Sequence, residues 1–479
     1  MNRDHERAVL IVGAGEAGRM VAAEIRGHRE LHAAVAGFLD DDPVFSDRMV
    51  DGIPILGRTS ELEAILASCS IDEIIIAIPT APGRFVRDMV KHCRRAGIPF
   101  KIVPGVMEII KGAVNIGQIR EVRVEDLLGR ETVDLDIESA KEVLAGKRIL
   151  VTGAGGTIGS ELCRQLAKVE PAELILLGRG ENRIFEIEDE LAAFHPRLAV
   201  RVMIHDLREW RRALQTIQRA EPDVIYHTAA HKHVHYMERD PDEAVINNVA
   251  VSSHLIRAAE HCGTGRFVFI STDKAANPTG VMGATKRIIE LYLRSKHEGS
   301  TCRFMTVRFG NVIGSTGSVV PLFLKQIERG GPVTVSDPRA TRYFMTVREA
   351  SLLVVRASVI GTGGETFILD MGEALNILEI AHDIIVLSGH EPENEIPIVI
   401  TGLREGEKLH EELINADEEL VQLDGERMML ARPSDPVPGD IERGVDEMIE
   451  LARKGETKKV LEAMSNLIPG CCLSDRAPV

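Results

Sequence analysis

The sequence predicts an α/β protein built from two Rossmann-like, doubly wound domains. Two glycine-rich loops carry this prediction, because each follows a short apolar run and precedes a helical pattern, at residues 8–25 and 147–166. The third observation is the length of 479 residues, which exceeds one ordinary hydrophobic core. We therefore expect an N-terminal domain over residues 1–120, a linker over 121–146 and a larger domain over 147–479 with a smaller C-terminal substrate-binding part.

Composition excludes several classes of protein. The net charge of −16 argues against a nucleic acid as partner. The seven cysteines are mostly isolated, a pattern that fits a reducing cytosol and neither a disulfide framework nor a zinc site. No apolar run approaches the ~18 residues of a membrane helix. We expect a cytoplasmic protein with no metal, no nucleic-acid partner and no membrane span in this chain.

The N-terminal domain begins with a strand at residues 8–12 that leads into a tight turn and a helix. Gly13, Gly15 and Gly18 lie where a GxGxxG loop brings its backbone close to a phosphate. Asp40 ends the next strand and could bind ribose hydroxyls. Because no catalytic cluster follows, we expect a non-catalytic role in nucleotide binding or oligomerisation. A purely structural or regulatory domain is the alternative.

The second glycine loop has the spacing TGxxGxxG, which is typical of short-chain dehydrogenase/reductase enzymes, particularly the extended branch that acts on sugar nucleotides. Arg179 ends the following strand and favours NADP, because a guanidinium pairs with a 2′-phosphate. Glu181 and Asn182 could instead bind the 2′-hydroxyl of NAD. The residues expected to bind NAD or NADP are Gly153, Gly156, Thr157, Ile158, Gly159, Arg179, Asp206, Leu207, Ala229, Ala230 and Lys286.

Four histidines, His227, His231, His233 and His235, alternate along one stretch and raise the question of a metal site. No carboxylate or cysteine completes a defined set of ligands in that stretch. Contacts near the cofactor are the simpler interpretation, and we expect no metal.

The most informative segment follows an apolar run at residues 267–270 that indicates a buried strand. Thr272, Asp273 and Lys274 place a hydroxyl, a carboxylate and an amine side by side, and Lys286 adds a second amine 13 residues after the carboxylate. An acid beside a base suits proton transfer. Alone, such a pair is more often a solvated turn with a surface ion pair. Beside the glycine loop and the second lysine, it indicates a catalytic site.

In these residues the chain resembles the bacterial UDP-N-acetylglucosamine 4,6-dehydratases of capsule, lipopolysaccharide and protein-glycan synthesis. The resemblance covers nearly the whole chain, including residues 125–130, 153–161, 229–234, 271–287, 308–321, 341–345 and 404–412. Long members of the family usually begin with transmembrane helices, which this sequence lacks. We expect either a naturally soluble form or the soluble portion of a membrane-anchored protein.

The resemblance implies an internal redox dehydration, in which the cofactor takes hydride from sugar C4 and returns it at C6 after water has left. By resemblance, Asp273 would protonate the C6 hydroxyl, Lys274 would remove the C5 proton, and Thr272 would hydrogen-bond the C4 oxygen. Asp273 must then hold a proton near neutral pH. The pKa of Lys274 must be lowered, and Lys286 together with the nicotinamide could supply the positive charge for this.

Met282 stands where enzymes of this class usually carry the tyrosine of a Tyr-x-x-x-Lys pair. Long family members commonly share this methionine, so we expect a family variant in which Lys286 still holds the nicotinamide ribose. The C4 proton would then leave through Thr272, Asp273 or a water. Tyr292 begins a literal Tyr-x-x-x-Lys, but at ~100° per residue it points about 120° away from Lys286. We expect Tyr292 to pack in the core.

The resemblance also covers the substrate. The residues expected to bind the UDP-sugar are Lys232, Asn311, Ser315, Ser318, Val319, Arg342, Arg404 and Glu407. Met282 and the long architecture resemble the branch that retains the C5 configuration, so we expect retention. A homo-oligomer is the family expectation. The alternatives are a UDP-sugar 4-epimerase, which does not need the Asp-Lys pair, and a non-catalytic nucleotide-sensing protein.

Overall fold

The protein divides into two compact units in the computed structural model. Unit 1 comprises Met1–Thr132, Leu322–Val335 and Leu378–Val399, and unit 2 comprises Val133–Pro321, Ser336–Ile377 and Ile400–Val479. The structure describes residues 6–28, 31–45, 49–103, 119–123, 125–126, 136–297, 299–434, 437, 439–468, 470–471 and 473. The domain bounds expected from the sequence, 1–120, 121–146 and 147–479, stay a prediction, because much of the linker lies outside these residues, including 127–130 of the resembling segment.

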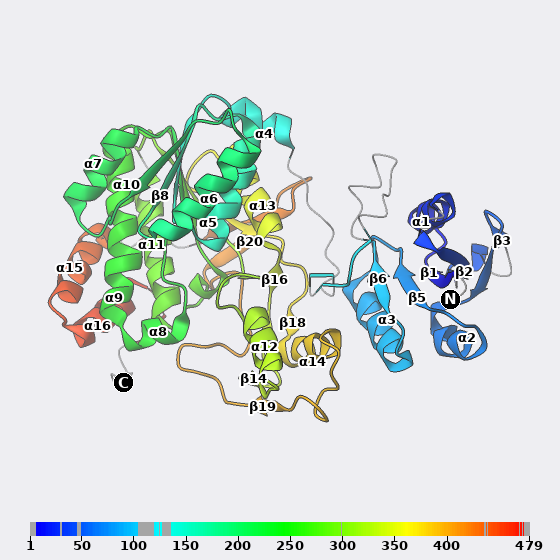
Figure 1. The fold of residues 1–479 in the computed structure, drawn as a ribbon. Helices are drawn as coiled ribbons and strands as arrows, with labels where there is room; N and C mark the ends of the chain where they lie inside the picture. Colours follow the sequence, from blue (N-terminus) through cyan, green and yellow to red (C-terminus); the bar gives the residue numbers. More distant parts are fainter. Residues whose placement is uncertain are drawn as a thin grey trace. The chain divides into compact units, whose positions relative to one another are not determined.

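Unit 1 contains a six-stranded sheet with the order β3-β4-β2-β1-β5-β6, parallel except for β3 (Figure 1). Its strands are β1 (Arg7–Val12), β2 (Ala33–Leu39), β3 (Met49–Val50), β4 (Ile53–Gly57), β5 (Glu73–Ile76) and β6 (Phe100–Ile102). Helix α1 (Glu16–Gly27) packs on one face, and α2 (Leu62–Ser68) and α3 (Gly83–Ala96) pack on the other. Helix α14 (Ile377–Leu387) contributes Asp383, which pairs with Arg87 and Lys91 of α3.

Unit 2 contains a nine-stranded sheet with the order β20-β21-β17-β12-β11-β10-β7-β8-β9, in which β20 and β21 are antiparallel to the strands beside them. Its strands are β7 (Arg148–Thr152), β8 (Glu173–Gly178), β9 (Val200–Ile204), β10 (Val224–His227), β11 (Arg266–Ile270), β12 (Arg303–Arg308), β17 (Thr366–Leu369), β20 (Glu418–Gln422) and β21 (Met428–Pro433). The seven parallel strands end at one edge, so the loops that follow them meet there.

Helices cover both faces of the unit 2 sheet. One face carries α4 (Ile137–Leu144), α5 (Thr157–Leu166), α6 (Glu181–Phe194) and α13 (Val347–Ile360). The other carries α7 (Trp210–Ala220), α10 (Val251–His261) and α11 (Val281–His297), with α15 (Ile441–Arg453) and α16 (Thr457–Leu467) beside α11 in Figure 1. Successive strand residues alternate between the two faces: Leu150 lies in one core and Val151 in the other. The predicted α/β class with doubly wound sheets is confirmed.

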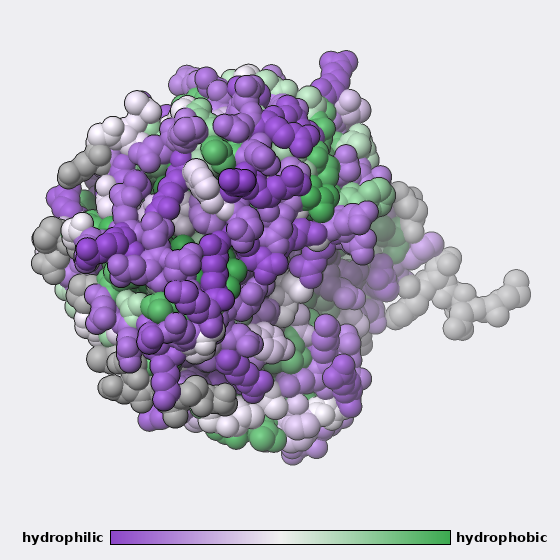
Figure 2. Space-filling model, turned by 90° about the vertical axis from the view of Figure 1, so that its left-hand side faces the viewer, coloured by the Kyte–Doolittle hydropathy of each residue, from purple (hydrophilic) through white to green (hydrophobic). Residues whose placement is uncertain are grey.

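Short strand pairs position the segments that follow the sheet. Strand β13 (Asn311–Val312) pairs with β16 (Phe344–Met345), and β15 (Thr341–Arg342) pairs with β18 (Leu375–Asn376). The other short elements are α8 (Val234–Arg239), α9 (Pro241–Ala244), η8 (Val245–Ala250), η9 (Asp273–Ala275), α12 (Val319–Glu328), β14 (Val333–Val335) and β19 (Ile398–Ile400). The face shown in Figure 2 is mostly hydrophilic, with apolar residues in small separate groups. Among the described residues, no helix has the length and apolar character needed to cross a membrane.

Candidate active site

The loop between β7 and α5 borders a cavity of about 370 Å³. Gly153 has a φ of +65°, a conformation that favours glycine. A Cβ on Gly159 would lie 2.2 Å from the Gly153 carbonyl oxygen, so only glycine lets α5 begin this close to the loop. The exposed N–H groups at the start of α5 suit an anion. The loop therefore fits the pyrophosphate of a dinucleotide.

Most residues assigned to the cofactor surround this cavity. Its lining includes Gly153, Gly156, Arg179, Asp206, Leu207, Ala229 and Ala230. Thr157, Ile158 and Gly159 lie beside it in the first turn of α5, and Lys286 lies on α11. None of these four residues lines the 370 Å³ cavity itself.

The far wall of the cavity is rich in guanidinium groups. Arg179 donates to the Asn247 side-chain oxygen at 2.9 Å and lies 3.7 Å from Asp206. Burial raises the pKa of Asp206. Hydrogen bonds from Arg208 lower that pKa by more than burial raises it, so the net pKa is below the usual range. Arg183 lines the same wall. This wall can accept a ribose hydroxyl through Asp206 or a phosphate through the arginines.

A buried histidine ties the glycine loop to the loop after β10. His227 is fully buried, with its two ring nitrogens 2.7 Å from Thr152 Oγ1 and 2.8 Å from Ser252 Oγ. Burial, reinforced by the nearby Lys286, lowers the pKa of His227 to about 3. The Thr152 hydroxyl oxygen also accepts from the Ala229 N–H at 3.3 Å. His227 is therefore a neutral structural group beneath the cofactor loops.

Asn248 is a candidate site residue that the sequence analysis missed. It lies in the π-helical segment η8, a distortion that often marks functional sites. Its amide oxygen accepts from the His231 N–H at 2.7 Å, and its amide nitrogen donates to the His231 carbonyl and to Thr285 Oγ1. The Asn247-Asn248 pair within an apolar run was the available signal. Asn248 connects the loop after β10 to α11.

Thr272, Asp273 and Lys274 follow β11 directly and enter the short 3₁₀ turn η9. Asp273 is fully buried, and its Oδ1 accepts from Thr272 Oγ1 at 2.8 Å and from Lys274 Nζ at 3.0 Å. Lys274 also donates to Asn311 Oδ1 at 3.1 Å, and its side chain keeps 22% of its exposure. Asp273 Oδ2 has no hydrogen-bond partner among the described residues. The structure thus brings together the predicted hydroxyl, carboxylate and amine.

A second carboxylate reaches the same lysine. Glu411 Oε1 lies 3.4 Å from Lys274 Nζ and 3.5 Å from Arg342 Nε. Burial lowers the pKa of Lys274, but the carboxylates of Asp273 and Glu411 outweigh it, so the net pKa is raised. The expectation that Lys286 lowers the pKa of Lys274 is wrong, because Arg342 is the cation that faces Lys274 and the two carboxylates prevail.

Of Lys274 and Lys286, the latter is the one with the lowered pKa. It is buried, donates to the Ile270 carbonyl at 2.8 Å and lies 4.5 Å above the Phe269 ring. Burial lowers its pKa to about 7, although Glu290 partly opposes the shift. Lys286 is therefore a weakly hydrated amine whose charge changes near neutral pH.

The start of α11 lies against η9. A Cβ on Gly283 would lie 2.1 Å from the Lys274 carbonyl oxygen, so glycine permits this approach. The neighbouring Met282 is buried in the core. Tyr292 is fully buried in the same core, and its hydroxyl accepts from Arg257 Nε at 2.7 Å. The expectation that Tyr292 packs in the core is confirmed.

The residues assigned to the substrate fall into two groups. Lys232 and Ser315 meet at 3.3 Å, and Ser318 and Val319 follow at the start of α12. Arg342 is buried instead of open to a phosphate, since it donates to the Thr341 and Leu409 carbonyls and lies 3.5 Å from Glu407. Arg404 is exposed, and its N–H donates to Glu407 Oε2 at 3.1 Å.

Comparison with known proteins assigns the chain to a family. Residues 149–433, more than half of the chain, match the family described as "Polysaccharide biosynthesis protein". The chain belongs to this polysaccharide biosynthesis protein family. Residues 1–104 match a second family, described as "CoA-binding domain".

Three similar proteins have names that concern polysaccharide biosynthesis or a nucleotide-sugar dehydration. "Probable polysaccharide biosynthesis protein EpsC" of Bacillus subtilis (strain 168) is 44% identical over 85% of this chain and 68% of its own length. "Capsular polysaccharide biosynthesis protein CapD" of Staphylococcus aureus is 39% identical over 96% of this chain and 77% of its own. "UDP-N-acetylglucosamine 4,6-dehydratase (inverting)" of Campylobacter jejuni subsp. jejuni serotype O:23/36 (strain 81-176) is 31% identical over 60% and 84%.

A solved structure is similar to this chain over more than half of its length. "X-ray structure of Pen from Bacillus thuringiensis" has a TM-score of 0.56 and 32% identity, and covers 61% of this chain and 92% of that one. The share of this chain agrees with the extent of the polysaccharide biosynthesis family match.

The predicted second nucleotide site is the N-terminal glycine loop, which hydrogen-bonds to Asp40 through its own backbone. Gly13, Gly15 and Gly18 lie between β1 and α1, as expected. Asp40 Oδ2 accepts from the Ala14 N–H at 2.7 Å, and Oδ1 accepts from the Asp42 N–H at 2.9 Å. Asp40 thus binds the N–H groups of its own loops, and nucleotide binding here stays a prediction.

Proposed function

We propose that this polysaccharide biosynthesis protein is a nucleotide-sugar 4,6-dehydratase, a lyase. Its substrate would be UDP-N-acetylglucosamine, its product UDP-2-acetamido-2,6-dideoxy-hexos-4-ulose, and C5 would keep its configuration. The carrying observation is the Asp273–Lys274 pair, with Oδ1 and Nζ 3.0 Å apart after β11. Similarity to a relative named as an inverting UDP-N-acetylglucosamine 4,6-dehydratase, 31% identical, supports the 4,6-dehydration. The proposed retention at C5 differs from the inversion in that name and rests on Lys274 as a single base.

The residues around the 370 Å³ cavity fit NAD or NADP. Gly153, Gly156 and the start of α5 would hold the pyrophosphate, and Lys286 the nicotinamide ribose. When bound, the nicotinamide would accept hydride from C4 and return it at C6. Arg179 supports NADP, while Asp206 is the group that would favour NAD.

The hydrogen bond from Thr272 to Asp273 supports a route for the C4 proton. The C4 hydroxyl would donate to Thr272 Oγ1, which already donates to Asp273 Oδ1 at 2.8 Å. As the hydride leaves C4, Asp273 would gain this proton. It would then donate the same proton to the C6 hydroxyl, which leaves as water. Met282 needs no proton in this scheme.

Lys274 supports the retention of configuration. Once C4 is a ketone, neutral Lys274 would take the C5 proton as the C6–O bond breaks. The lysine would return a proton to C5, from the same side, after hydride reaches C6. One base on one face gives retention. Because Lys274 is held as a cation by two carboxylates, turnover should rise with pH as this cation loses its proton.

Mass spectrometry tests the reaction. The protein incubated with UDP-N-acetylglucosamine and NAD or NADP should give a product lighter by one water. Asp273→Asn and Lys274→Met should abolish this loss, and Tyr292→Phe serves as the matched control. An unchanged mass with inverted C4 would identify an epimerase, and no turnover with several UDP-sugars would leave a nucleotide-sensing protein. Proton NMR of the product reads the C5 configuration.

We propose supporting roles for the other predicted residues. Lys232, Ser315, Ser318 and Val319 would contact the UDP-sugar, together with Asn311, Arg404 and Glu407. Unit 1 would bind a nucleotide or support a homo-oligomer, consistent with its match to a CoA-binding family. Titration calorimetry with CoA and with NAD distinguishes these roles of unit 1.

A further inference from the structure

Glu411 is a buried acid that the proposed reaction does not use. Its side chain is 2% exposed and lies between Lys274 Nζ, at 3.4 Å, and Arg342 Nε, at 3.5 Å. Its Oε2 is buried and has no hydrogen-bond partner among the described residues. A buried carboxylate is costly unless nearby cations stabilise it, so this one is held by the two that flank it.

The backbone fixes Glu411 in this place. Thr341 donates its N–H to the Leu409 carbonyl at 3.0 Å, and Arg342 donates to the same carbonyl at 3.1 Å. His410 and Thr341 form an isolated parallel β-bridge. These contacts with β15 hold the next residue, Glu411, beside Lys274, although β15 is remote in sequence from η9.

The Lys274 ammonium has three hydrogens and faces three acceptors. They are Asp273 Oδ1 at 3.0 Å, Asn311 Oδ1 at 3.1 Å and Glu411 Oε1 at 3.4 Å. Asp273 would change charge during the reaction and Asn311 is neutral. Glu411 is the carboxylate beside Lys274 that takes no part in the proposed reaction.

We propose that Glu411 is a positioning residue that sets the base strength of Lys274, with Arg342 moderating its charge. This inference rests on the proposed dehydration. The charged groups that face Lys274 are Asp273, Glu411 and Arg342. A fixed anion raises the pKa of Lys274. The neutral amine is then a stronger base, but the ammonium loses its proton only at higher pH. The anion also stabilises the cation that forms when the C5 proton is taken.

The test is the pH dependence of kcat/KM for loss of water from UDP-N-acetylglucosamine. Glu411→Gln should move the acidic limb about one unit lower and reduce the plateau rate, because Lys274 becomes a weaker base. Glu411→Asp should keep the limb in place. Arg342→Gln should move it in the opposite direction, to higher pH. Glu412→Gln, an exposed neighbour paired with Lys408, is the matched control and should keep the wild-type profile.

A measurement without turnover separates this inference from the proposed function. The Cε chemical shift of Lys274, in protein labelled with ¹³C-lysine and assigned with Lys274→Arg, reports its titration directly. A midpoint lower by about one unit in Glu411→Gln supports the inference. An unchanged midpoint and an unchanged limb overturn it. Wild-type protein that releases no water would overturn the proposed function, and the titration would still decide the role of Glu411.

Discussion

The charge of Lys274 depends on side chains that come from distant parts of the chain. Its neighbour Asp273 is visible in the sequence, but Glu411 and Arg342 reach it only through the fold. For this reason the sequence predicted the residues of the site and predicted the wrong direction for the pKa of Lys274. Of Lys274 and Lys286, it is Lys286 that has the lowered pKa, because burial outweighs the nearby Glu290.

Substitutions of Tyr292 and of Lys286 should differ in their effect on turnover. Tyr292→Phe removes only a hydroxyl that accepts from Arg257 in the core, so kcat should stay within about threefold of wild type. Lys286→Ala removes the amine proposed to hold the nicotinamide ribose and should lower kcat/KM by at least about 100-fold. Steady-state kinetics measures both. Loss of turnover in Tyr292→Phe with an active Lys286→Ala would reverse the assignment.

His227 should make the protein less stable in acid. Its pKa is about 3 in the folded state against an ordinary value near 6.5, so the unfolded chain binds more protons between these values. Stability from this group is complete above about pH 6.5 and falls as the pH drops toward 3. At pH 5 the loss should be about 2 kcal/mol. In urea unfolding, His227→Gln should lose less stability than wild type between pH 7 and 5; parallel losses would contradict this role.

At the scale of elements, the parallel strands were predictable and the C-terminal ones were not. Strands such as β5 and β11 are continuous apolar runs because both faces are covered. Strand β20 is mostly polar and exposed, and its register is set by β21 across the sheet edge. The π-helical segment η8 was also missed, because its apolar sequence equally suits an ordinary helix.

The approach of α11 to η9 should be sensitive to one methyl group. In Gly283→Ala the new Cβ meets the Lys274 carbonyl oxygen, so the helix or the turn must shift. A displacement of about 1 Å at Lys274 should lower kcat about 100-fold. Gly27→Ala is the matched control, because a Cβ there meets open space. Equal kinetics for the two variants would show that the contact does not position the site.

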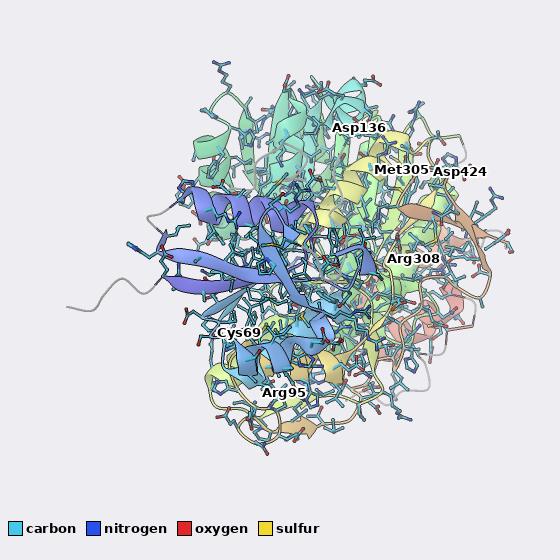
Figure 3. The ribbon with its side chains drawn as sticks, turned by 90° about the vertical axis from the view of Figure 1, so that its right-hand side faces the viewer. Cys69, Arg95, Asp136, Met305, Arg308 and Asp424 are labelled. Atoms are coloured by element: carbon cyan, nitrogen blue, oxygen red, sulfur yellow. The ribbon has the colours of Figure 1, made fainter. Side chains whose placement is uncertain are left out.

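At the scale of the molecule, a buried ion network joins helix α11 and the central strand β12 to β20, an end strand of the unit 2 sheet. Arg308, labelled with Met305 in Figure 3, extends from β12 to Glu290 at 2.6 Å and to Glu418 of β20 at 2.8 Å. Arg287 reaches Glu418 at 2.7 Å. Ser271 donates to Glu290, so the network extends to the residue before Thr272.

Removal of Arg308 should therefore destabilise unit 2 as a whole. Arg308→Met leaves two buried carboxylates with Arg287 as their remaining cation, which should cost about 3 kcal/mol. Arg339→Met removes the surface pair with Asp337 and should leave the free energy of unfolding close to that of the wild type. Urea unfolding followed by circular dichroism compares them. Similar costs for the two variants would contradict the importance of the network.

The same network has a consequence for synthesis on the ribosome. Glu418 and strand β21 emerge more than a hundred residues after Arg308, yet β21 pairs with β17 and Glu418 neutralises the buried arginine. Before they emerge, the nascent sheet has an open edge and an incompletely paired charge in its interior. The candidate site segment after β11 is made early, but its supporting core closes late in translation. Nascent chains that stop short of β21 should accordingly remain sensitive to protease.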